Sequence, residues 1–418
     1  MNFYKIFLMF IAIIFSLNNI VLADDENANF SDNVSSLIDV SADLTETPNI
    51  NSRSAIIYDR TSGAILFGKK HNSPVKMAST TKIMTAIIVL ENSNLDDIVT
   101  ISSKAAGTGG SRLGLKTNDK ISVRDLLYGL MLCSGNDAAV ALAEHVGGTL
   151  PDFAILMNNK GKFLELTSTN FVTPHGLDND NHYTTAYELA VITNYALKNE
   201  TFRRYVGTKN HTVYINGNPK NLSNTNELLG NLNGVYGVKT GFTNGANRCL
   251  VTAVKRSNMD LICVVLGADT KKFRTQDSVK LIEYAFKNFE MVNIKEKIIS
   301  EFDNWKLCNS SSFIVKKGIS NNLDIILKDL PYDFFPVNCN HINDISIYIY
   351  CNTTLEAPLA ANSAIGYLTV SINNKNVLSL DIYNSISISK KDYSNFFNDL
   401  IKNYISHLET LLYKKSLL

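Results

Sequence analysis

Apolar and polar residues follow one another along the chain with spacings that predict both strands and helices. Two short apolar runs, residues 54–59 and 64–67, flank a glycine-containing turn and predict a β-hairpin. Residues 80–90 carry apolar side chains at three- and four-residue steps, which predicts a helix. Residues 250–254 and 261–266 are largely apolar and rich in β-branched side chains, which is typical of sheet strands.

Further helical spacing lies between these strand predictions. Residues 123–146 predict two helices that are broken near Ser134-Gly135-Asn136, because Gly and Asn favour a turn there. Residues 185–198 predict a third helix. Because these helices lie between N-terminal and C-terminal strands, we expect an α/β (α+β) domain in which helices cover a sheet.

The pattern changes after about residue 290. Short β-like runs such as residues 322–327 and 345–350 alternate with turns, which predicts a small all-β domain that ends near Ile388. Residues 389–418 return to a helical period, and their apolar residues form one continuous stripe. The stripe consists of Phe396, Phe397, Leu400, Ile401, Tyr404, Ile405, Leu408, Leu411 and Leu412.

This stripe predicts an amphipathic C-terminal helix. Lysine pairs at residues 390–391 and 414–415 bracket it with positive charge. The segment holds no run of about 18 apolar residues, so it cannot span a bilayer. We therefore expect the helix to lie in the plane of an anionic membrane surface. Docking on its own β domain or on a second copy of the chain is the alternative.

The N-terminal residues 1–23 have the pattern of a secretory signal. Lys5 supplies the positive charge, residues 6–17 are almost all apolar, and a small-residue cleavage pattern ends at Ala23. An uncleaved anchor is the alternative. In both cases we expect the remainder to be exported, to the outer face of the cytoplasmic membrane or the cell wall. Residues 24–51 are polar and predict a linker.

The remaining chain divides into a mixed domain at residues 52–290, a β-rich domain at 291–388 and the amphipathic helix at 389–418. Of the 418 residues, 45% are hydrophobic and 40 basic residues face 39 acidic ones. That balance excludes a disordered chain and provides no overall field that would attract nucleic acid.

Six cysteines are scattered without the paired spacing of metal sites. A Cys339–Cys351 bridge and buried free thiols both stay open. His175 and His182 flank a loop but also lack metal-ligand spacing, so we expect neither a metal nor another cofactor.

A candidate nucleophile stands at the start of the predicted helix at residues 80–90. Ser79 and Lys82 are three residues apart and share one helical face, so the lysine amine can reach the serine hydroxyl. A serine needs a base to become nucleophilic, and a lysine serves only if its pKa is lowered. The same S-x-x-K spacing occurs at Ser73 and Ser387, but Pro74 and the extended pattern around Ser387 argue against those positions.

Two further polar elements follow in the chain. Ser134-Gly135-Asn136 lies in the break between two predicted helices, and Lys239-Thr240-Gly241 leads into an edge-like strand. Each alone could be an ordinary polar turn. Three weak motifs in this order, each on the required element, are jointly specific.

The set resembles the penicillin-recognising serine enzymes, whose S-x-x-K, S-x-N and K-T-G elements line one cleft. More narrowly, it resembles the D-alanyl-D-alanine carboxypeptidases among the low-molecular-mass penicillin-binding proteins. That closer resemblance is carried by residues 77–85, 134–143, 173–178 and 237–243. It covers residues 52–289 and continues more loosely to the C-terminus. It implies a β-lactamase/transpeptidase-like domain with an antiparallel sheet covered by helices.

The resemblance also implies roles for individual residues. Ser79 would attack the carbonyl between two terminal D-alanines, Lys82 would take its proton, and Ser134 would protonate the leaving amine. The backbone N–H groups of Ser79 and Phe242 would form the oxyanion hole. The residues implied in substrate binding are Asn136, Lys239, Thr240, Gly241, Phe242 and Arg274.

Arg274 is a second candidate, beside Lys239 and Thr240, for binding the terminal carboxylate. A surface arginine at a helix start is the alternative. Glu165 invites comparison with the deacylating glutamate of class A β-lactamases. Asn170 lies five residues later, where that motif requires Asn at four, so Glu165 is interpreted as a solvated helix residue.

The implied activity is removal of the terminal D-alanine from peptidoglycan stem peptides. The implied partners are peptides ending in D-Ala-D-Ala, β-lactams as covalent inhibitors and a membrane surface, without nucleic acid. A β-lactamase or a D,D-transpeptidase would use the same acyl-enzyme and stays an alternative. A non-catalytic wall-peptide-binding protein is an alternative of another class, disfavoured because all three polar elements are intact.

Overall fold

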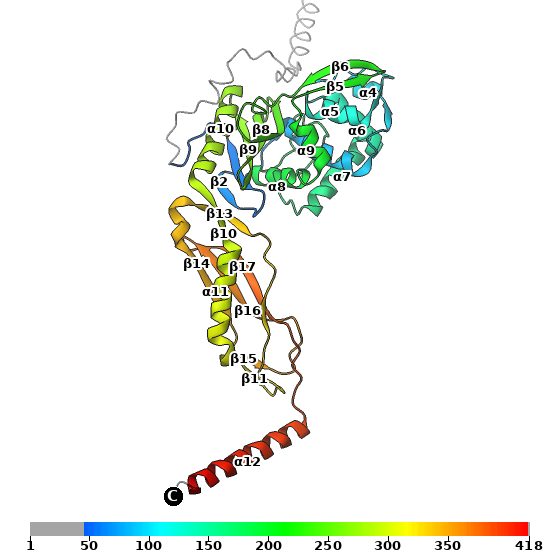
Figure 1. The fold of residues 1–418 in the computed structure, drawn as a ribbon. Coiled ribbons are helices and arrows are strands. Elements are labelled where there is room, and N and C mark those ends of the chain that lie inside the picture. Colours follow the sequence, from blue (N-terminus) through cyan, green and yellow to red (C-terminus); the bar gives the residue numbers. More distant parts are fainter. Residues whose placement is uncertain (1–45, 417–418) are drawn as a thin grey trace, which may run out of the picture. The chain divides into compact units, whose positions relative to one another are not determined.

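The computed structural model describes residues 46–416 (Figure 1). The chain divides into two compact units, the first ending at Phe289 and the second beginning at Glu290. The predicted signal at residues 1–23 and the predicted linker up to residue 45 lie outside the described residues.

The first unit contains a five-stranded antiparallel sheet in the order β2-β1-β9-β8-β7. The strands are β1 (Ser54–Asp59), β2 (Ile65–Lys69), β7 (Val235–Thr243), β8 (Asn247–Arg256) and β9 (Met259–Ala268). Every residue of β1 is buried. Because side chains alternate between the two faces of a strand, both faces of the sheet are covered there. The predicted hairpin and the predicted antiparallel sheet are confirmed.

Helices cover this sheet and build a cluster beside it. α8 (Ala186–Ala196) packs against β1 and β9, and α10 (Lys271–Asn288) packs against β8 and β9. The short 3-10 helix η3 (Ala78–Thr81) leads directly into α3 (Lys82–Asn92), which packs among the neighbouring helices. The remaining elements are β3 (Ile98–Thr100), α4 (Ser103–Ala106), β4 (Lys120–Ser122), α5 (Val123–Met131), α6 (Asn136–Gly147), α7 (Leu150–Phe163), α9 (Glu200–Gly207), β5 (Asn210–Ile215) and β6 (Asn218–Ser223).

Side-chain caps define where several helices begin. The Ser122 side chain accepts a hydrogen bond from Asp125 N at the start of α5. Thr185 caps α8 in the same way. Each cap satisfies a backbone N–H that has no partner inside the helix. The predicted break lies between α5 and α6, and Ser134 adopts a positive φ of 59° within it.

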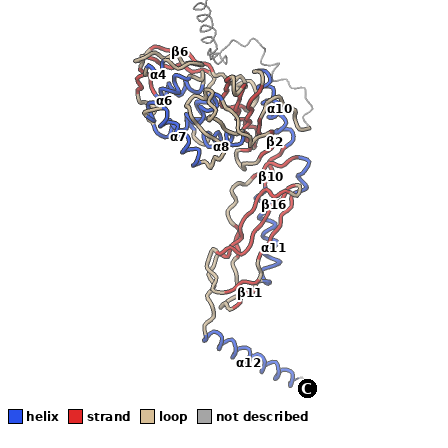
Figure 2. The backbone as a smooth tube through the Cα atoms, turned by 180° about the vertical axis from the view of Figure 1, so that it is seen from behind, coloured by secondary structure: helices blue, strands red, loops and turns tan. Residues whose placement is uncertain are grey.

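The second unit combines a four-stranded antiparallel sheet, in the order β12-β17-β16-β14, with two smaller strand pairs and a helix (Figure 2). Its elements are β10 (Phe289–Asn293), α11 (Ile294–Asn309), η4 (Ser310–Ser312), β11 (Ile314–Lys316), β12 (Ile325–Leu327), β13 (Phe334–Asn338), η5 (Cys339–Asp344), β14 (Ile345–Cys351), β15 (Thr354–Glu356), β16 (Ser363–Ile372) and β17 (Lys375–Asn384). The β16–β17 turn places Asn373 and Asn374 at positive φ, as a two-residue hairpin of type I′ requires.

Helix α11 was not anticipated by the prediction of an all-β segment. Ile294, Ile298 and Phe302 are buried and stand four residues apart, so a helical period was present in the sequence. The run of strands after it is as expected.

The chain ends in the long helix α12 (Tyr393–Ser416), so the predicted C-terminal helix is present. The large apolar side chains on it are exposed, namely Phe396, Phe397, Leu400, Ile401, Tyr404, Ile405 and Leu408. Among residues 46–416, none of the helices has the length and apolar content needed to cross a membrane.

Candidate active site

The Ser79 hydroxyl and the Lys82 amine meet at the junction of η3 and α3. Lys82 Nζ donates a hydrogen bond of 2.8 Å to Ser79 Oγ. Ser79 is 5% exposed and Lys82 is completely buried. The residue before the serine, Ala78, has a positive φ of 48°, a conformation that a non-glycine residue adopts only when its surroundings hold it there.

The second motif reaches the same amine from the break between α5 and α6. Lys82 Nζ donates to Ser134 Oγ at 3.2 Å and to Asn136 Oδ1 at 2.7 Å. The amide nitrogen of Asn136 in turn donates to the Gly109 carbonyl at 2.8 Å, which orients the side chain. Both Ser134 and Asn136 are buried. The structure therefore brings the first two predicted motifs together around one amine.

The neighbouring residue Asp137 holds a loop against the start of α6. Its carboxylate accepts hydrogen bonds from the backbone N–H groups of Leu113, Gly114 and Leu115, at 2.7 to 3.0 Å. A carboxylate in the first turn of a helix is also favoured by the helix dipole. This role of Asp137 was not predicted from the sequence, because its partners lie more than 20 residues earlier in the chain.

The third motif lies on β7, the edge strand of the sheet that packs against η3. A Cβ atom at Gly241 would lie only 3.0 Å from Ser79 N, so glycine permits the close approach of this strand to the nucleophile. Lys239 stands two residues earlier, on the same face of the strand, and is 1% exposed. The hydroxyl of Thr240, between these two residues, lies 2.7 Å from the hydroxyl of Thr225.

A loop between α7 and α8 encloses the nucleophile segment from the opposite side. The His175 carbonyl accepts a hydrogen bond of 3.1 Å from Lys82 Nζ, and the Pro174 carbonyl accepts one of 2.6 Å from Thr85 Oγ1. Gly176 has a φ of 85°, and a Cβ there would lie 2.0 Å from the Ala78 carbonyl oxygen. This loop therefore leaves no space for a side chain at residue 176.

His182 connects the same loop to the residue before Lys82. Its Nδ1 accepts a hydrogen bond of 3.0 Å from Val172 N, so its Nε2 carries the proton. Nε2 lies 2.8 Å from Thr81 Oγ1, which itself donates to the Ala78 carbonyl at 2.7 Å. His182 thus supports the turn that presents Ser79. This role was not predicted from the sequence, where the histidine was weighed only as a metal ligand.

Both histidines of the loop are neutral near neutral pH. Burial, with a further contribution from the nearby Lys82 side chain, lowers the pKa of His175 to about 3. Burial lowers the pKa of His182 to about 4. Burial also raises the pKa of the Cys133 thiol, next to Ser134, to about 11. Cys133 is therefore protonated and is not a competing nucleophile.

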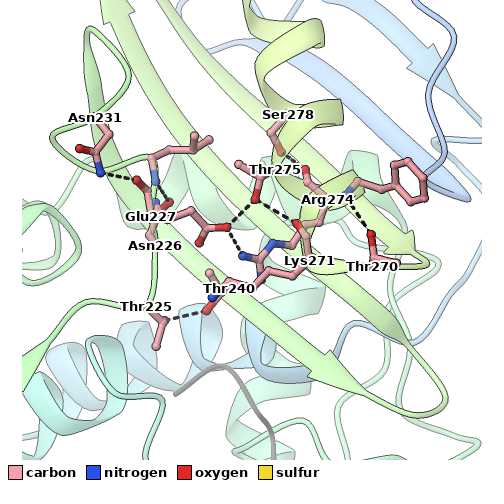
Figure 3. Close-up of polar contacts among 12 residues, drawn as sticks. Thr225, Asn226, Glu227, Asn231, Thr240, Thr270, Lys271, Arg274, Thr275 and Ser278 are labelled. Atoms are coloured by element: carbon pink, nitrogen blue, oxygen red, sulfur yellow. Dashed lines mark hydrogen bonds and ion pairs between the residues drawn. The ribbon is translucent and has the colours of Figure 1, made fainter. Parts of the chain in front are cut away.

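Arg274, on α10, is held by an ion pair with Glu227 (Figure 3). Its guanidinium lies 2.5 Å from Glu227 Oε1, and its side chain has no exposed surface. Although burial disfavours the charged form of Glu227, the Arg274 cation lowers the pKa of that carboxyl below its usual value. The alternative interpretation of Arg274 as a surface residue is wrong. Glu227 and Thr225 belong to the segment that precedes β7, so this segment links Arg274 to Thr240.

Glu165, Ser387 and Ser73, which were also considered from the sequence, lie outside this site. Glu165 lines a cavity of about 500 Å³ together with Tyr58, Tyr187 and Glu188 among others, and none of the predicted site residues is part of that lining. Ser387 belongs to the second unit. Ser73 lies in a turn in which its N–H donates to the Lys70 carbonyl.

Comparison with known proteins matches this geometry to one enzyme family. The family model of the D-alanyl-D-alanine carboxypeptidases, peptidase family S11, matches residues 41–270. The D-alanyl-D-alanine carboxypeptidase DacF of Bacillus subtilis is 32% identical over 76% of this chain and 81% of its own length. DacA of Haemophilus influenzae is 34% identical over 80% of this chain and 84% of its own length.

Solved structures agree with the sequence matches. Penicillin binding protein 5 from Haemophilus influenzae superposes with a TM-score of 0.69 at 30% identity and covers 82% of this chain and 99% of its own. The Streptomyces K15 DD-transpeptidase superposes with a TM-score of 0.55 at 36% identity and covers 58% of this chain and 99% of its own. The chain therefore belongs to peptidase family S11, the serine-type D-alanyl-D-alanine carboxypeptidases.

Proposed function

We propose that this chain removes the terminal D-alanine from peptidoglycan stem peptides through an acyl-enzyme formed on Ser79. The observation that supports this most directly is the position of the buried Lys82 amine. It lies 2.8 Å from Ser79 Oγ and 3.2 Å from Ser134 Oγ, within reach of both hydroxyls between which a proton must move. The family to which the chain belongs has the same activity.

Acylation begins when Ser79 Oγ attacks the carbonyl between the two terminal D-alanines and its proton passes to Lys82 Nζ. The C–N bond then breaks, and the leaving amine takes a proton that reaches it through Ser134 Oγ. Free D-alanine departs and the peptide stays as an ester on Ser79. Water attacks this ester, gives up a proton by the same route, and releases the shortened peptide.

Two further groups would stabilise the tetrahedral intermediates. We assign the oxyanion hole to the backbone N–H groups of Ser79 and Phe242, because Gly241 allows β7 to approach the nucleophile this closely. The Asn136 side chain, fixed by the Gly109 carbonyl, is placed to bind the backbone of the stem peptide.

The terminal carboxylate requires a positively charged subsite. We assign this subsite to Lys239 and Thr240 on β7, with Arg274 as a further positive charge. Since the Arg274 guanidinium is paired with Glu227, we propose that it acts mainly by holding the segment that carries Thr225 against Thr240. It is a positioning residue in this assignment.

The test uses a pentapeptide ending in D-Ala-D-Ala and mass spectrometry of the products. We expect loss of one alanine from the peptide, and attachment of a labelled penicillin to Ser79 that disappears in Ser79→Ala. A matched control is Ser73→Ala, which removes the serine of the competing S-x-x-K pattern. Undiminished labelling of Ser79→Ala, or loss of labelling in Ser73→Ala, would contradict the assignment.

Transpeptidation is a second candidate because the likeness to the Streptomyces K15 DD-transpeptidase covers 99% of that chain. Both reactions share the acyl-enzyme and differ only in whether water or an amine attacks it. Adding an amine acceptor to the same assay distinguishes them. A product that carries the amine in place of D-alanine would favour transpeptidation.

We also propose that the enzyme is exported and that α12 holds it at the surface of an anionic membrane. The apolar side chains of α12 from Phe396 to Leu408 are exposed, and Lys390 and Lys391 precede the helix. A helix with an apolar stripe and flanking lysines suits the boundary between lipid head groups and acyl chains. This position would keep the enzyme near newly made peptidoglycan.

A further inference from the structure

The sheet of the second unit exposes a cluster of tyrosines on one of its two faces. Tyr348 and Tyr350 stand two residues apart on β14 and therefore point to the same side. Tyr367 of β16 lies directly opposite Tyr350 in the register. The three side chains are 59%, 61% and 46% exposed, and the ring centres of Tyr350 and Tyr367 are 5.3 Å apart. We call these three residues the tyrosine face.

The hydrophobic core of this sheet uses the opposite face. Leu368 and Val370, which alternate with Tyr367 and Thr369 along β16, are completely buried. Leu380 of β17, opposite Leu368, is 4% exposed. The tyrosine face is therefore not needed for core packing. A contiguous group of exposed aromatic side chains is typical of a binding surface.

Polar side chains complete the tyrosine face across the neighbouring strands. Thr369 of β16 lies opposite Tyr348, and Ser379 of β17 lies opposite Thr369. Asp381 of β17 lies opposite Tyr367. Two rows of side chains thus cross the sheet. The first row is Tyr350, Tyr367 and Asp381, and the second is Tyr348, Thr369 and Ser379. Each row offers a flat apolar surface with hydrogen-bonding groups beside it.

Two neighbouring side chains, Tyr383 and Lys328, partly neutralise the negative charge of Asp381. Tyr383 Oη donates to its carboxylate at 3.1 Å, and Lys328 Nζ lies 4.0 Å from it. These residues therefore give the face little net charge. A neutral ligand with both apolar and hydroxyl surfaces fits this chemistry better than an anionic one.

A groove adjoins the tyrosine face at the free edge of β14. It has a volume of about 770 Å³, lies between α11 and β14, and includes Tyr348 and Ser346 in its lining. The α11 side chains in the lining are polar, namely Asn293 at the helix cap, Glu296, Lys297, Ser300 and Glu301. Ile345 and Ile347 also line the groove and point to the face opposite the tyrosines, so the groove runs around the edge of β14, from Tyr348 toward α11.

We propose that the tyrosine face and this groove bind the glycan strand of peptidoglycan. A sugar ring presents C–H groups on its flat sides, which stack on tyrosine rings, and hydroxyls around its rim, which bond to Thr369, Ser379 and Asp381. Neighbouring strands lie about 4.8 Å apart, so the row from Tyr350 to Asp381 spans about 10 Å, comparable to a disaccharide. The inference rests on the proposed function, because the stem peptides hang from this glycan.

Other occupants fit the face less well. An anionic membrane surface would be met by lysines, whereas Lys328 beside this face is paired with Asp381. A stable contact with a second copy of the chain would bury about 800 Å² on each partner. Three tyrosines that are 46–61% exposed supply at most about half of that area, and the polar side chains of Thr369 and Ser379 stand beside them.

Binding is tested on the full chain with tetra-N-acetylchitotetraose, a soluble oligomer of N-acetylglucosamine, by calorimetry. Replacing Tyr350→Ser together with Tyr367→Ser should weaken binding roughly tenfold, since two stacking contacts are lost. The pair Tyr350→Phe and Tyr367→Phe keeps the rings and should retain most of the affinity. Tyr393→Ser, which removes a tyrosine that is 95% exposed outside this face, is the matched control.

Activity provides the second measurement. The serine pair should hydrolyse a soluble pentapeptide like the native chain but release D-alanine more slowly from intact peptidoglycan. Equal oligosaccharide binding by the native chain and the serine pair would overturn the inference, as would equal loss in the phenylalanine pair. Loss of a dimer or of vesicle binding in the serine pair, with unchanged sugar binding, would assign the face to those partners instead. Failure of the native chain to cleave any peptide would contradict the proposed function alone, because sugar binding is measured separately.

Discussion

Single residues at the junction of η3 and α3 are held in place by contacts from three directions. Lys82 contacts Ser79 and Ser134, β7 approaches through Gly241, and His182 supports the turn from the loop before α8. The positive φ of Ala78 needs such support, because a non-glycine residue in this region is strained. Small changes at the supporting residues should therefore slow the reaction and also lower the stability of the fold.

Gly241→Ala tests the approach of β7 to the nucleophile. The new Cβ would lie 3.0 Å from Ser79 N and 3.2 Å from both Thr80 N and Ala78 Cβ, so the strand or the turn must move. We expect acylation by a labelled penicillin to slow about tenfold or more, and the unfolding free energy to fall by about 1–3 kcal/mol.

Gly161→Ala is the matched control for that change. A Cβ there meets only Leu166 Cδ1 at 3.8 Å, an ordinary contact, and helix α7 gains from alanine. Acylation should be unchanged in this variant. Native acylation by Gly241→Ala would show that β7 does not need glycine at this position.

His182→Phe tests the support from the loop. The ring is kept but both nitrogens are lost, which leaves Val172 N and Thr81 Oγ1 without these partners. We expect a loss of about 1–3 kcal/mol in unfolding free energy and slower acylation with little change in KM. The control is His341→Phe, at a partly exposed histidine of the second unit. Equal effects of both substitutions on acylation would contradict a positioning role.

The helices and strands differ in how far their apolar side chains are buried. The strands β1 and β9 of the first unit are covered on both faces. In contrast, the apolar side chains of α12 from Phe396 to Leu408 are in contact with solvent. Burying an apolar side chain of this size is worth about 1.5–3 kcal/mol, so an exposed stripe indicates a surface that is covered in the working protein.

Removing residues 390–418 tests the membrane proposal for α12. We expect the shortened chain to stop sedimenting with vesicles that contain anionic lipid, while its rate of pentapeptide hydrolysis stays near that of the full chain. Vesicles of neutral lipid provide the control, since the lysine contribution is lost with them. Continued sedimentation, or loss of folding in the shortened chain, would assign α12 a structural role instead.

The stability of the whole molecule should depend on pH through the two buried histidines. The pKa of His182 is about 4 and that of His175 about 3 in the folded chain, against about 6.5 when unfolded. Between these values the unfolded chain binds more protons, so lowering the pH favours unfolding. The stability that the two neutral histidines contribute is fully present above about pH 6.5. It is lost as the pH falls toward 4, the pKa of His182, and then toward 3, the pKa of His175.

Thermal unfolding between pH 7 and pH 4 measures this effect. We expect the native chain to lose up to a few kcal/mol over this interval, and His182→Phe to lose less because one of the two titrating groups is gone. The same pH slope in both proteins would show that His182 does not contribute.

The sequence alone determined the local elements and the reactive residue types. Apolar residues that recur every two residues share one face of a strand, and those that recur every three or four share one face of a helix. This spacing, with the turn residues between the elements, is enough to predict the β1–β2 hairpin, the α5–α6 break and α12. The three catalytic motifs are likewise local, so Ser79, Lys82 and Ser134 could be singled out together. The spacing of Ile294, Ile298 and Phe302 is also helical, but it was missed and α11 was not predicted.

Tertiary structure decided which distant residues meet. His182 and Thr81 are separated by about 100 residues and Arg274 and Glu227 by about 47, and no local pattern connects either pair. The same holds for Tyr350 and Tyr367, which meet only because β14 and β16 pair in one register. A periodicity records which side a residue faces, whereas its partner depends on the path of the whole chain. That path is set by the packing of all elements at once.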